Sequence, residues 1–280
     1  MCRLFGFRSV IQSQVHQSLV NADNALRVQS EFHPDGWGVA YYQGHSPHVI
    51  KTDKSALSDM LFIRVSGVVR SETVVAHIRK ATKGENNILN THPFQFGHWV
   101  FAHNGNIKNF DSLRKDILKS IKPQLRRFIL GDTDSELIFY FLLSELSDVY
   151  DLNRKDCPVD IATKSVKKSI QKLEKLIGKI NPDDNAPPSE TFATFILTNG
   201  TTMVAHQGGK RLFYSTYKTS CADKEFCSHY ADVCENPTKD GTINHLIFTS
   251  EPLSGENIWL DMNPYDVVGV DWKMKLTKLD

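Results

Sequence analysis

The chain begins with Met1-Cys2-Arg3-Leu4-Phe5-Gly6-Phe7, which places a cysteine directly behind a methionine. Methionine is normally trimmed when the next side chain is small, and Cys2 would then carry a thiol and a free α-amine on one residue. The amine, with a pKa of about 7.7–8.0, can act as base for a thiol whose ordinary pKa is about 8.5. A nucleophile activated by its own N-terminal amine needs no histidine. Cys2 is therefore a candidate nucleophile, and an accident of composition is the alternative.

The composition predicts a globular protein with a proper core. The chain has 280 residues, of which 40% are hydrophobic, and a net charge of +1. Charges of both signs are interspersed, which argues against nucleic acid and against a membrane surface as partners. No stretch approaches the roughly 18 apolar residues of a membrane-spanning helix. These features favour small-molecule chemistry.

The cysteines predict a reducing compartment. Their number is odd for so long a chain, and they are Cys2, Cys157, Cys221, Cys227 and Cys234. No apolar segment of signal-peptide type follows the N-terminus, so we expect a cytoplasmic protein with reduced thiols. Three of the cysteines and His229 lack the paired C-x-x-C spacing of a zinc site, so we expect no metal.

Hydrophobic periodicity predicts strands, then helices, then strands. The first strands are expected at 3–9, 39–42, 73–79 and 99–103. Helices are expected at 16–29, 111–121, 135–146 and 159–180. Short strands return at 191–197, 202–206, 212–217, 245–249 and 266–271. This order predicts an α+β domain rather than a parallel βαβ one. The linker-like segment 181–188 is too weak a signal to divide the chain, so we expect one domain, 2–280, with Met1 removed.

Six motifs follow one another in the first half of the chain. They are Cys2-Arg3-Leu4-Phe5-Gly6, Asp35-Gly36-Trp37-Gly38, Ala76-His77-Ile78-Arg79-Lys80-Ala81-Thr82, Asn90-Thr91-His92-Pro93-Phe94, His103-Asn104-Gly105-Asn106-Ile107 and Asp132-Thr133-Asp134-Ser135-Glu136. Together they resemble the class II glutamine amidotransferases, a family of N-terminal-nucleophile hydrolases. The later segment 249–253 is similar to stand-alone members related to the glutathione-degrading amidotransferase of fungi. The resemblance implies a four-layer αββα sandwich of mostly antiparallel sheets.

The resemblance also implies a catalytic set of Cys2, Asn104 and Gly105. Attack of the thiolate on a γ-carboxamide produces an oxyanion, which needs fixed hydrogen-bond donors. The Asn104 side chain and the Gly105 N–H match the family's oxyanion hole, and a glycine lets the backbone come close to the substrate. On local sequence alone, Asn-Gly would instead indicate a hairpin turn.

The family's substrate contacts fall on Arg79, Thr82, His92 and Asp134. A guanidinium can hold the α-carboxylate of a γ-glutamyl group through two hydrogen bonds, and a carboxylate can hold its α-ammonium. Arg79 and Asp134 match those positions, while Thr82 and His92 match lesser contacts. The alternatives are a surface arginine, a helix N-cap for Asp134 and a core histidine for His92.

The expected function is hydrolysis of a γ-glutamyl amide such as glutamine or glutathione through a γ-glutamyl thioester, without cofactor. Lys80 and Lys83 stand where synthase-coupled members have an aromatic residue and a histidine, and no nucleotide motif follows residue 150. The alternatives are a glutaminase subunit that supplies ammonia to a separate synthase, a catalytically idle subunit, and a papain-like enzyme built from Cys2, His103 and Asn104. A homo-oligomer, or a complex with a peptidase or synthase, is compatible with these readings.

Overall fold

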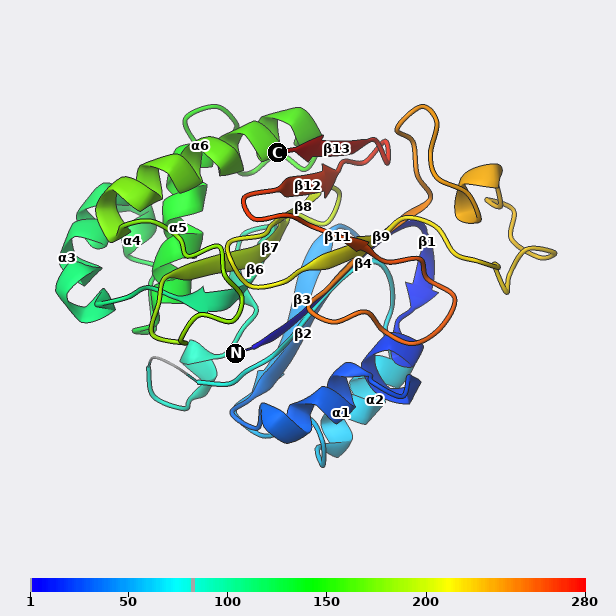
Figure 1. Ribbon diagram of the computed structural model, residues 1–280, viewed down its shortest axis with the longest axis horizontal. Helices are drawn as coiled ribbons and strands as arrows, with labels where there is room; N and C mark the ends of the chain where they lie inside the picture. Colours follow the sequence, from blue (N-terminus) through cyan, green and yellow to red (C-terminus); the bar gives the residue numbers. More distant parts are fainter. Residues whose placement is uncertain (1, 82–83) are drawn as a thin grey trace.

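The computed structural model describes residues 2–81 and 84–280, which form two packed β-sheets with helices on both outer faces (Figure 1). The first sheet contains, in spatial order, β11 (Leu260–Asp261), β9 (Phe213–Ser215), β10 (His245–Thr249), β1 (Arg3–Gln14), β4 (Arg70–Ile78), β2 (Trp37–Gln43) and β3 (Ser46–Thr52). The second contains β13 (Leu276–Leu279), β12 (Val267–Val270), β8 (Met203–His206), β7 (Phe192–Thr198), β6 (Trp99–Asn106) and β5 (Phe94–Phe96). Every strand pair in the described residues is antiparallel.

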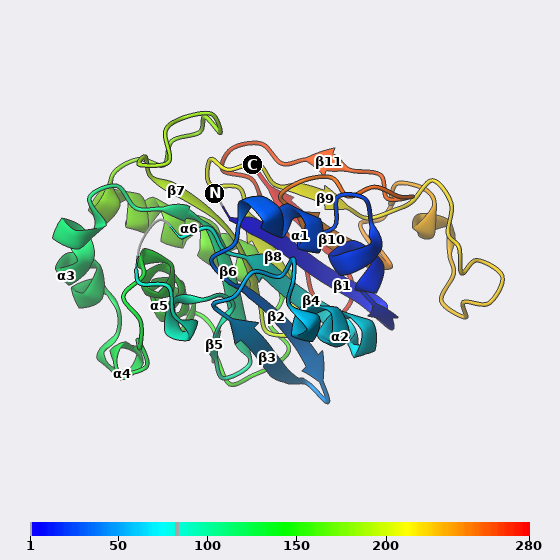
Figure 2. The same cartoon turned by 90° about the horizontal axis from the view of Figure 1, so that it is seen from below.

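Helices cover both sheets (Figure 1), and in the view from below α1 overlaps the strands of the first sheet (Figure 2). The outer face of the first sheet packs against α1 (Leu26–Gln29), α2 (Met60–Val68) and the short turns η1 (Gln17–Asn21) and η2 (Ser30–Phe32). On the second sheet lie α3 (Phe110–Ser120), α4 (Pro123–Arg126), α5 (Asp134–Leu146) and α6 (Val159–Ile177). A third apolar cluster fills the space between the sheets. The fold is the expected α+β sandwich in four layers, αββα.

The sequence explains two of the helices that pack on the second sheet. α6 buries one apolar stripe and ends before Gly178, which has a φ of +84°. α5 is buried on almost every side, because it lies among α3, α6 and β6. None of the helices in 2–81 and 84–280 is long and apolar enough to cross a lipid bilayer.

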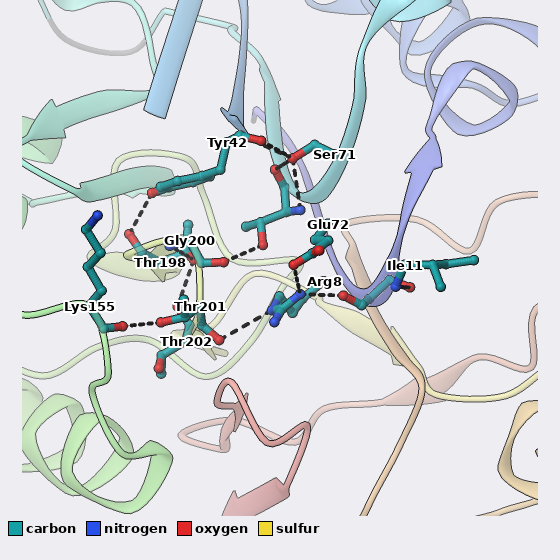
Figure 3. A network of polar contacts seen from close by, with 12 residues as sticks. Arg8, Ile11, Tyr42, Ser71, Glu72, Lys155, Thr198, Gly200, Thr201 and Thr202 are labelled. Atoms are coloured by element: carbon teal, nitrogen blue, oxygen red, sulfur yellow. Dashed lines mark hydrogen bonds and ion pairs between the residues drawn. The ribbon is translucent and has the colours of Figure 1, made fainter. Parts of the chain in front are cut away.

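A polar network joins the two sheets at one end of the sandwich (Figure 3). The Tyr42 hydroxyl donates to the Thr198 carbonyl at 3.2 Å, and Arg8 Nε donates to the Thr201 carbonyl at 3.3 Å. Thr73 Oγ1 reaches the Gly200 carbonyl at 2.6 Å. Tyr42 and Thr198 lie at or near the ends of β2 and β7, Gly200 and Thr201 lie between β7 and β8, and Arg8 and Thr73 come from β1 and the first half of β4. The network therefore fixes the sheets at the end opposite to Cys2.

The structure corrects two local predictions. The helix expected at 16–29 is replaced by η1 and α1, because Ala22 is extended and Asn24 is hydrogen-bonded to Pro252 and Ser254. Asn104-Gly105 is not a turn but lies inside β6. The prediction also lacked β3 and α2, whose apolar residues do not alternate clearly.

Candidate active site

The start of β1 and the end of β4 meet at one edge of the first sheet. Arg3 pairs with Ile78, so Cys2 lies opposite Arg79, the residue that follows β4. The end of β6 reaches the same edge from the second sheet, since the rings of His77 on β4 and His103 on β6 both lie near the His92 ring. The candidate site is therefore assembled from both sheets.

The half-buried Cys2 thiol contacts the backbone of Lys80. The Lys80 N–H donates to Sγ at 3.3 Å, and Sγ lies 3.4 Å from the Lys80 carbonyl oxygen. Burial raises the pKa of the Cys2 thiol, whereas the Lys80 N–H and the Arg79 guanidinium lower it and the Asp134 carboxylate raises it. Both charged side chains therefore lie within electrostatic range of the thiol.

The buried Arg79 guanidinium is held by the loop that follows it. Nη1 donates to Asn86 Oδ1 at 2.8 Å, and Nη2 donates to the Glu85 carbonyl at 3.4 Å. Burial lowers the pKa of Arg79, and the charges of Cys2 and Asp35 raise it. The Asp35-Gly36 turn fixes the backbone, because Arg79 N–H donates to the Gly36 carbonyl and Asp35 N–H to the Arg79 carbonyl.

Asp134 is buried at the first residue of α5. Its Oδ2 accepts the Ile107 N–H at 2.7 Å, and its Oδ1 accepts the Ser135 N–H at 2.8 Å. The helix N-cap is Thr133, whose hydroxyl accepts the Glu136 N–H. The N-cap alternative for Asp134 is therefore wrong. Oδ1 also accepts the Ser135 hydroxyl at 3.4 Å, so among the described contacts it is Oδ2 that keeps a further lone pair for another donor.

Asn104 and Gly105 pair with Thr194 and Ala193 of β7. The Asn104 side chain is 3% exposed, and its Oδ1 has no hydrogen-bond partner within residues 2–81 and 84–280. A Cβ at Gly105 would overlap the Phe192 carbonyl group and the ring of His103. Packing between strands is thus sufficient to require this glycine, whatever lies on its other side.

His92 is buried beside two other imidazoles. Its ring lies 4.2 Å from that of His77 and 6.5 Å from that of His103, centroid to centroid. Burial lowers the pKa of all three, that of His77 to about 3. His103 uses both ring nitrogens, one with Ser135 Oγ at 2.8 Å and one with the Phe192 carbonyl at 3.2 Å. This pairing opposes the papain-like alternative, which needs an imidazole directed at Cys2.

The remaining predicted residue, Thr82, lies outside the described residues, as does Lys83. No group of histidine, cysteine or acidic side chains within 2–81 and 84–280 is arranged to hold a metal ion. The sequence analysis assigned no role to Asn86 or to the Lys80 backbone, both of which contact predicted site residues. Neither carries a local signal, because both contacts depend on how the loops close.

The geometry combines a thiol, a cation, an anion and a backbone edge. The thiol has the Lys80 N–H donor beside it, the Arg79 cation directly follows β4 at the same edge, and the buried Asp134 anion lies at the start of α5. Such an arrangement suits nucleophilic attack on a small zwitterionic substrate.

Comparison with known proteins agrees with this geometry. The family model of the class-II glutamine amidotransferases matches residues 1–271. A putative glutamine amidotransferase of Haemophilus influenzae is 35% identical over 211 residues, which cover 74% of this chain and 63% of that protein. The probable glutamine amidotransferase DUG3 of Saccharomyces cerevisiae is 28% identical over 82% of this chain and 68% of its own length. The gamma-glutamyl-hercynylcysteine sulfoxide hydrolase of Mycobacterium tuberculosis is 33% identical over 38% of this chain and 49% of its own length.

Solved structures show the same fold. A glutamine aminotransferase class-II domain protein from Silicibacter pomeroyi superposes with a TM-score of 0.62 at 18% identity, covering 100% of this chain and 99% of that one. Glutamine phosphoribosylpyrophosphate amidotransferase from Bacillus subtilis also gives 0.62, at 14% identity, covering 99% of this chain and 49% of the other. The two sheets thus have the same arrangement as in these amidotransferase structures. With its family model matched from residue 1 to residue 271, the chain belongs to the class II glutamine amidotransferases.

Proposed function

We propose that this protein hydrolyses the γ-glutamyl amide bond of a small molecule, with Cys2 as nucleophile after removal of Met1. One observation carries the proposal: the Cys2 thiol lies beside the backbone that carries Arg79, and the buried Asp134 carboxylate is bonded to the Ile107 N–H directly after β6, the strand that brings Asn104 and Gly105 to the same edge. A γ-glutamyl group has an α-carboxylate that suits a guanidinium and an α-ammonium that suits a carboxylate. Thr82 and His92 are proposed as secondary contacts with the same group.

The reaction follows from these positions. The α-amine of Cys2 takes the thiol proton, and the thiolate attacks the γ-carbonyl carbon. The oxyanion receives hydrogen bonds from the Asn104 amide and the Gly105 N–H. The C–N bond then breaks, the leaving amine takes the proton, and a γ-glutamyl thioester remains. Water, deprotonated by the same α-amine, hydrolyses the thioester to glutamate and restores the thiol.

The proposed contacts recognise the glutamyl half of the substrate and do not select its leaving group. The Mycobacterium tuberculosis relative is named as a hydrolase of a γ-glutamyl compound, which supports an amine or peptide as leaving group here. Glutathione is one such substrate. A second candidate is a glutaminase that supplies ammonia to a synthase, because the similar Bacillus subtilis structure is named as a glutamine phosphoribosylpyrophosphate amidotransferase.

A substrate panel tests both candidates. Glutamine, a γ-glutamyl amino acid and glutathione are incubated with the protein, and ammonia and free amine are measured separately. The same panel is run with Cys2→Ala and with Cys157→Ala as control, since burial raises the pKa of the Cys157 thiol to about 12 and leaves it unreactive. Cleavage that is lost in Cys2→Ala alone is expected. Equal turnover by Cys2→Ala and wild type would refute the mechanism, and turnover of glutamine alone would favour the glutaminase.

A further inference from the structure

Asn90 connects the loop that holds Arg79 to the loop that leads into Asp134. Its Nδ2 donates to the Glu85 carbonyl at 3.0 Å, and the same carbonyl accepts Arg79 Nη2 at 3.4 Å. Its Oδ1 accepts the Asp132 N–H at 3.1 Å, two residues before Asp134. One side chain thus spans the gap between the two charged groups.

The pocket around this carboxamide is shaped for it. Asn90 is 0% exposed, and two glycines leave it room: a Cβ at Gly84 would lie 2.9 Å from Nδ2, and one at Gly131 would lie 2.5 Å from Oδ1. Its partners are a backbone carbonyl, which only accepts, and a backbone N–H, which only donates. The orientation of the amide is therefore fixed by its partners, and an aspartate of the same size cannot replace the donor.

A second contact supports the same loop. Glu136 Oε1 accepts the Leu130 N–H at 3.0 Å, and Oε2 accepts the Gly131 N–H at 2.7 Å. The loop before Asp134 is therefore fixed on its own helix, and Asn90 ties the Arg79 loop to this anchored loop. The separation of the guanidinium from the carboxylate depends on that tie.

We propose that Asn90 is a positioning residue that sets the spacing between Arg79 and Asp134, and so the recognition of the α-carboxylate and α-ammonium together. The inference rests on the proposed function, in which those two groups are held at once. A displacement of about 1 Å in a binding group can cost about 100-fold in rate, so the spacing of the two charged groups is itself a determinant of the rate. Asn90 touches no substrate and acts only through the two loops.

The test measures discrimination rather than activity alone. The kcat/KM of a γ-glutamyl amide is compared with those of two analogues, one without the α-amine and one with the α-carboxylate esterified. In Asn90→Asp we expect the ratio of kcat/KM for the parent amide to kcat/KM for each analogue to fall by about tenfold or more. The parent loses its contacts with both Arg79 and Asp134, whereas each analogue makes only one of these two contacts in the wild type. A role in folding alone would lower all three values together.

The matched control is Asn199→Asp. Asn199 is also buried, donates to the Lys155 carbonyl at 3.2 Å and accepts the Thr202 N–H at 2.9 Å, but it lies at the far end of the sandwich. The Asn199→Asp variant should be less stable than the wild type, but its discrimination between the parent amide and the analogues should be unchanged. If Asn90→Asp does not fold, Gly131→Ala displaces Asn90 Oδ1 without changing Asn90 itself.

The outcomes separate the two hypotheses. A folded Asn90→Asp or Gly131→Ala variant with wild-type discrimination overturns the positioning role and leaves the proposed function intact. A wild type that cleaves no γ-glutamyl amide overturns both. Loss of discrimination in the Asn90 variant, and not in the Asn199 variant, is the result that we expect.

Discussion

Gly105→Ala tests whether the position of the Gly105 backbone N–H depends on the close contact between β6 and β7. The added Cβ would lie 2.7 Å from the Phe192 carbonyl carbon and would overlap the carbonyl oxygen, against 3.4 Å or more in an ordinary contact. The strands would have to separate by more than the roughly 0.7 Å that the contact with the carbonyl carbon alone requires, in a sheet where close packing resists such shifts. β7 is also held by β8 on its other side. Overpacking of this kind costs about 1–3 kcal/mol, and a weakened ladder hydrogen bond adds about 1 kcal/mol.

We therefore expect Gly105→Ala to lose about 2–4 kcal/mol of unfolding free energy. For a chain of this size the loss corresponds to a fall in Tm of roughly 4–16 °C. Urea and thermal unfolding measure it, and kcat for a γ-glutamyl amide should fall as the Gly105 N–H moves. The control is Gly67→Ala in α2, where a Cβ would only reach ordinary contact with His16 at 3.8 Å. That change should be neutral or stabilising by up to about 1 kcal/mol. Equal Tm values for Gly105→Ala and wild type would refute the packing argument.

Four further predictions concern the proposed nucleophile, the proposed oxyanion hole, the proposed carboxylate contact of Arg79, and a buried imidazole. Intact mass should show active protein without Met1, and full activity with a tag ahead of Cys2 would contradict the α-amine as base. Asn104→Ala should lower kcat by about 10²–10³ with a smaller change in KM; a change in KM alone would exclude it from the oxyanion hole. Arg79→Lys should lower kcat/KM strongly, because an ammonium cannot form the bidentate pair, and an unaffected variant would remove Arg79 from the carboxylate site. Burial lowers the pKa of His77 from 6.5 to about 3, so the unfolded chain binds the proton first and stability should fall as pH drops through that window. Urea titrations at pH 7 and pH 5 should show that the unfolding free energy falls less for His77→Gln than for the wild type. Equal falls in both proteins would contradict a lowered pKa of His77 as the cause.

Local sequence was sufficient for many of the regular elements, although it missed β3 and α2. The β-branched run before Arg79 gave β4, and helical spacing gave α3, α5 and α6 within a few residues of their ends. It failed at 16–29, where tertiary hydrogen bonds to Pro252 and Ser254 interrupt the helix. It also failed at Asp134, because Thr133 and Asp134 are both acceptable N-caps, and the Ile107 N–H decides between them.

In the candidate site, too, the sequence indicated some features and the tertiary structure decided others. Residue identity and motif order were sufficient to identify the family, and they indicated Cys2 as candidate nucleophile and Arg79 and Asp134 as a candidate charged pair, since chemistry is carried by residue type. The sequence could not show that Asn104-Gly105 continues a strand rather than forming a turn, because the pairing partner in β7 lies nearly 90 residues away. Nor could it show that Asn90 joins two loops. Those features depend on hydrogen bonds between segments that meet only when the sheets pack, and only the tertiary structure brings them together.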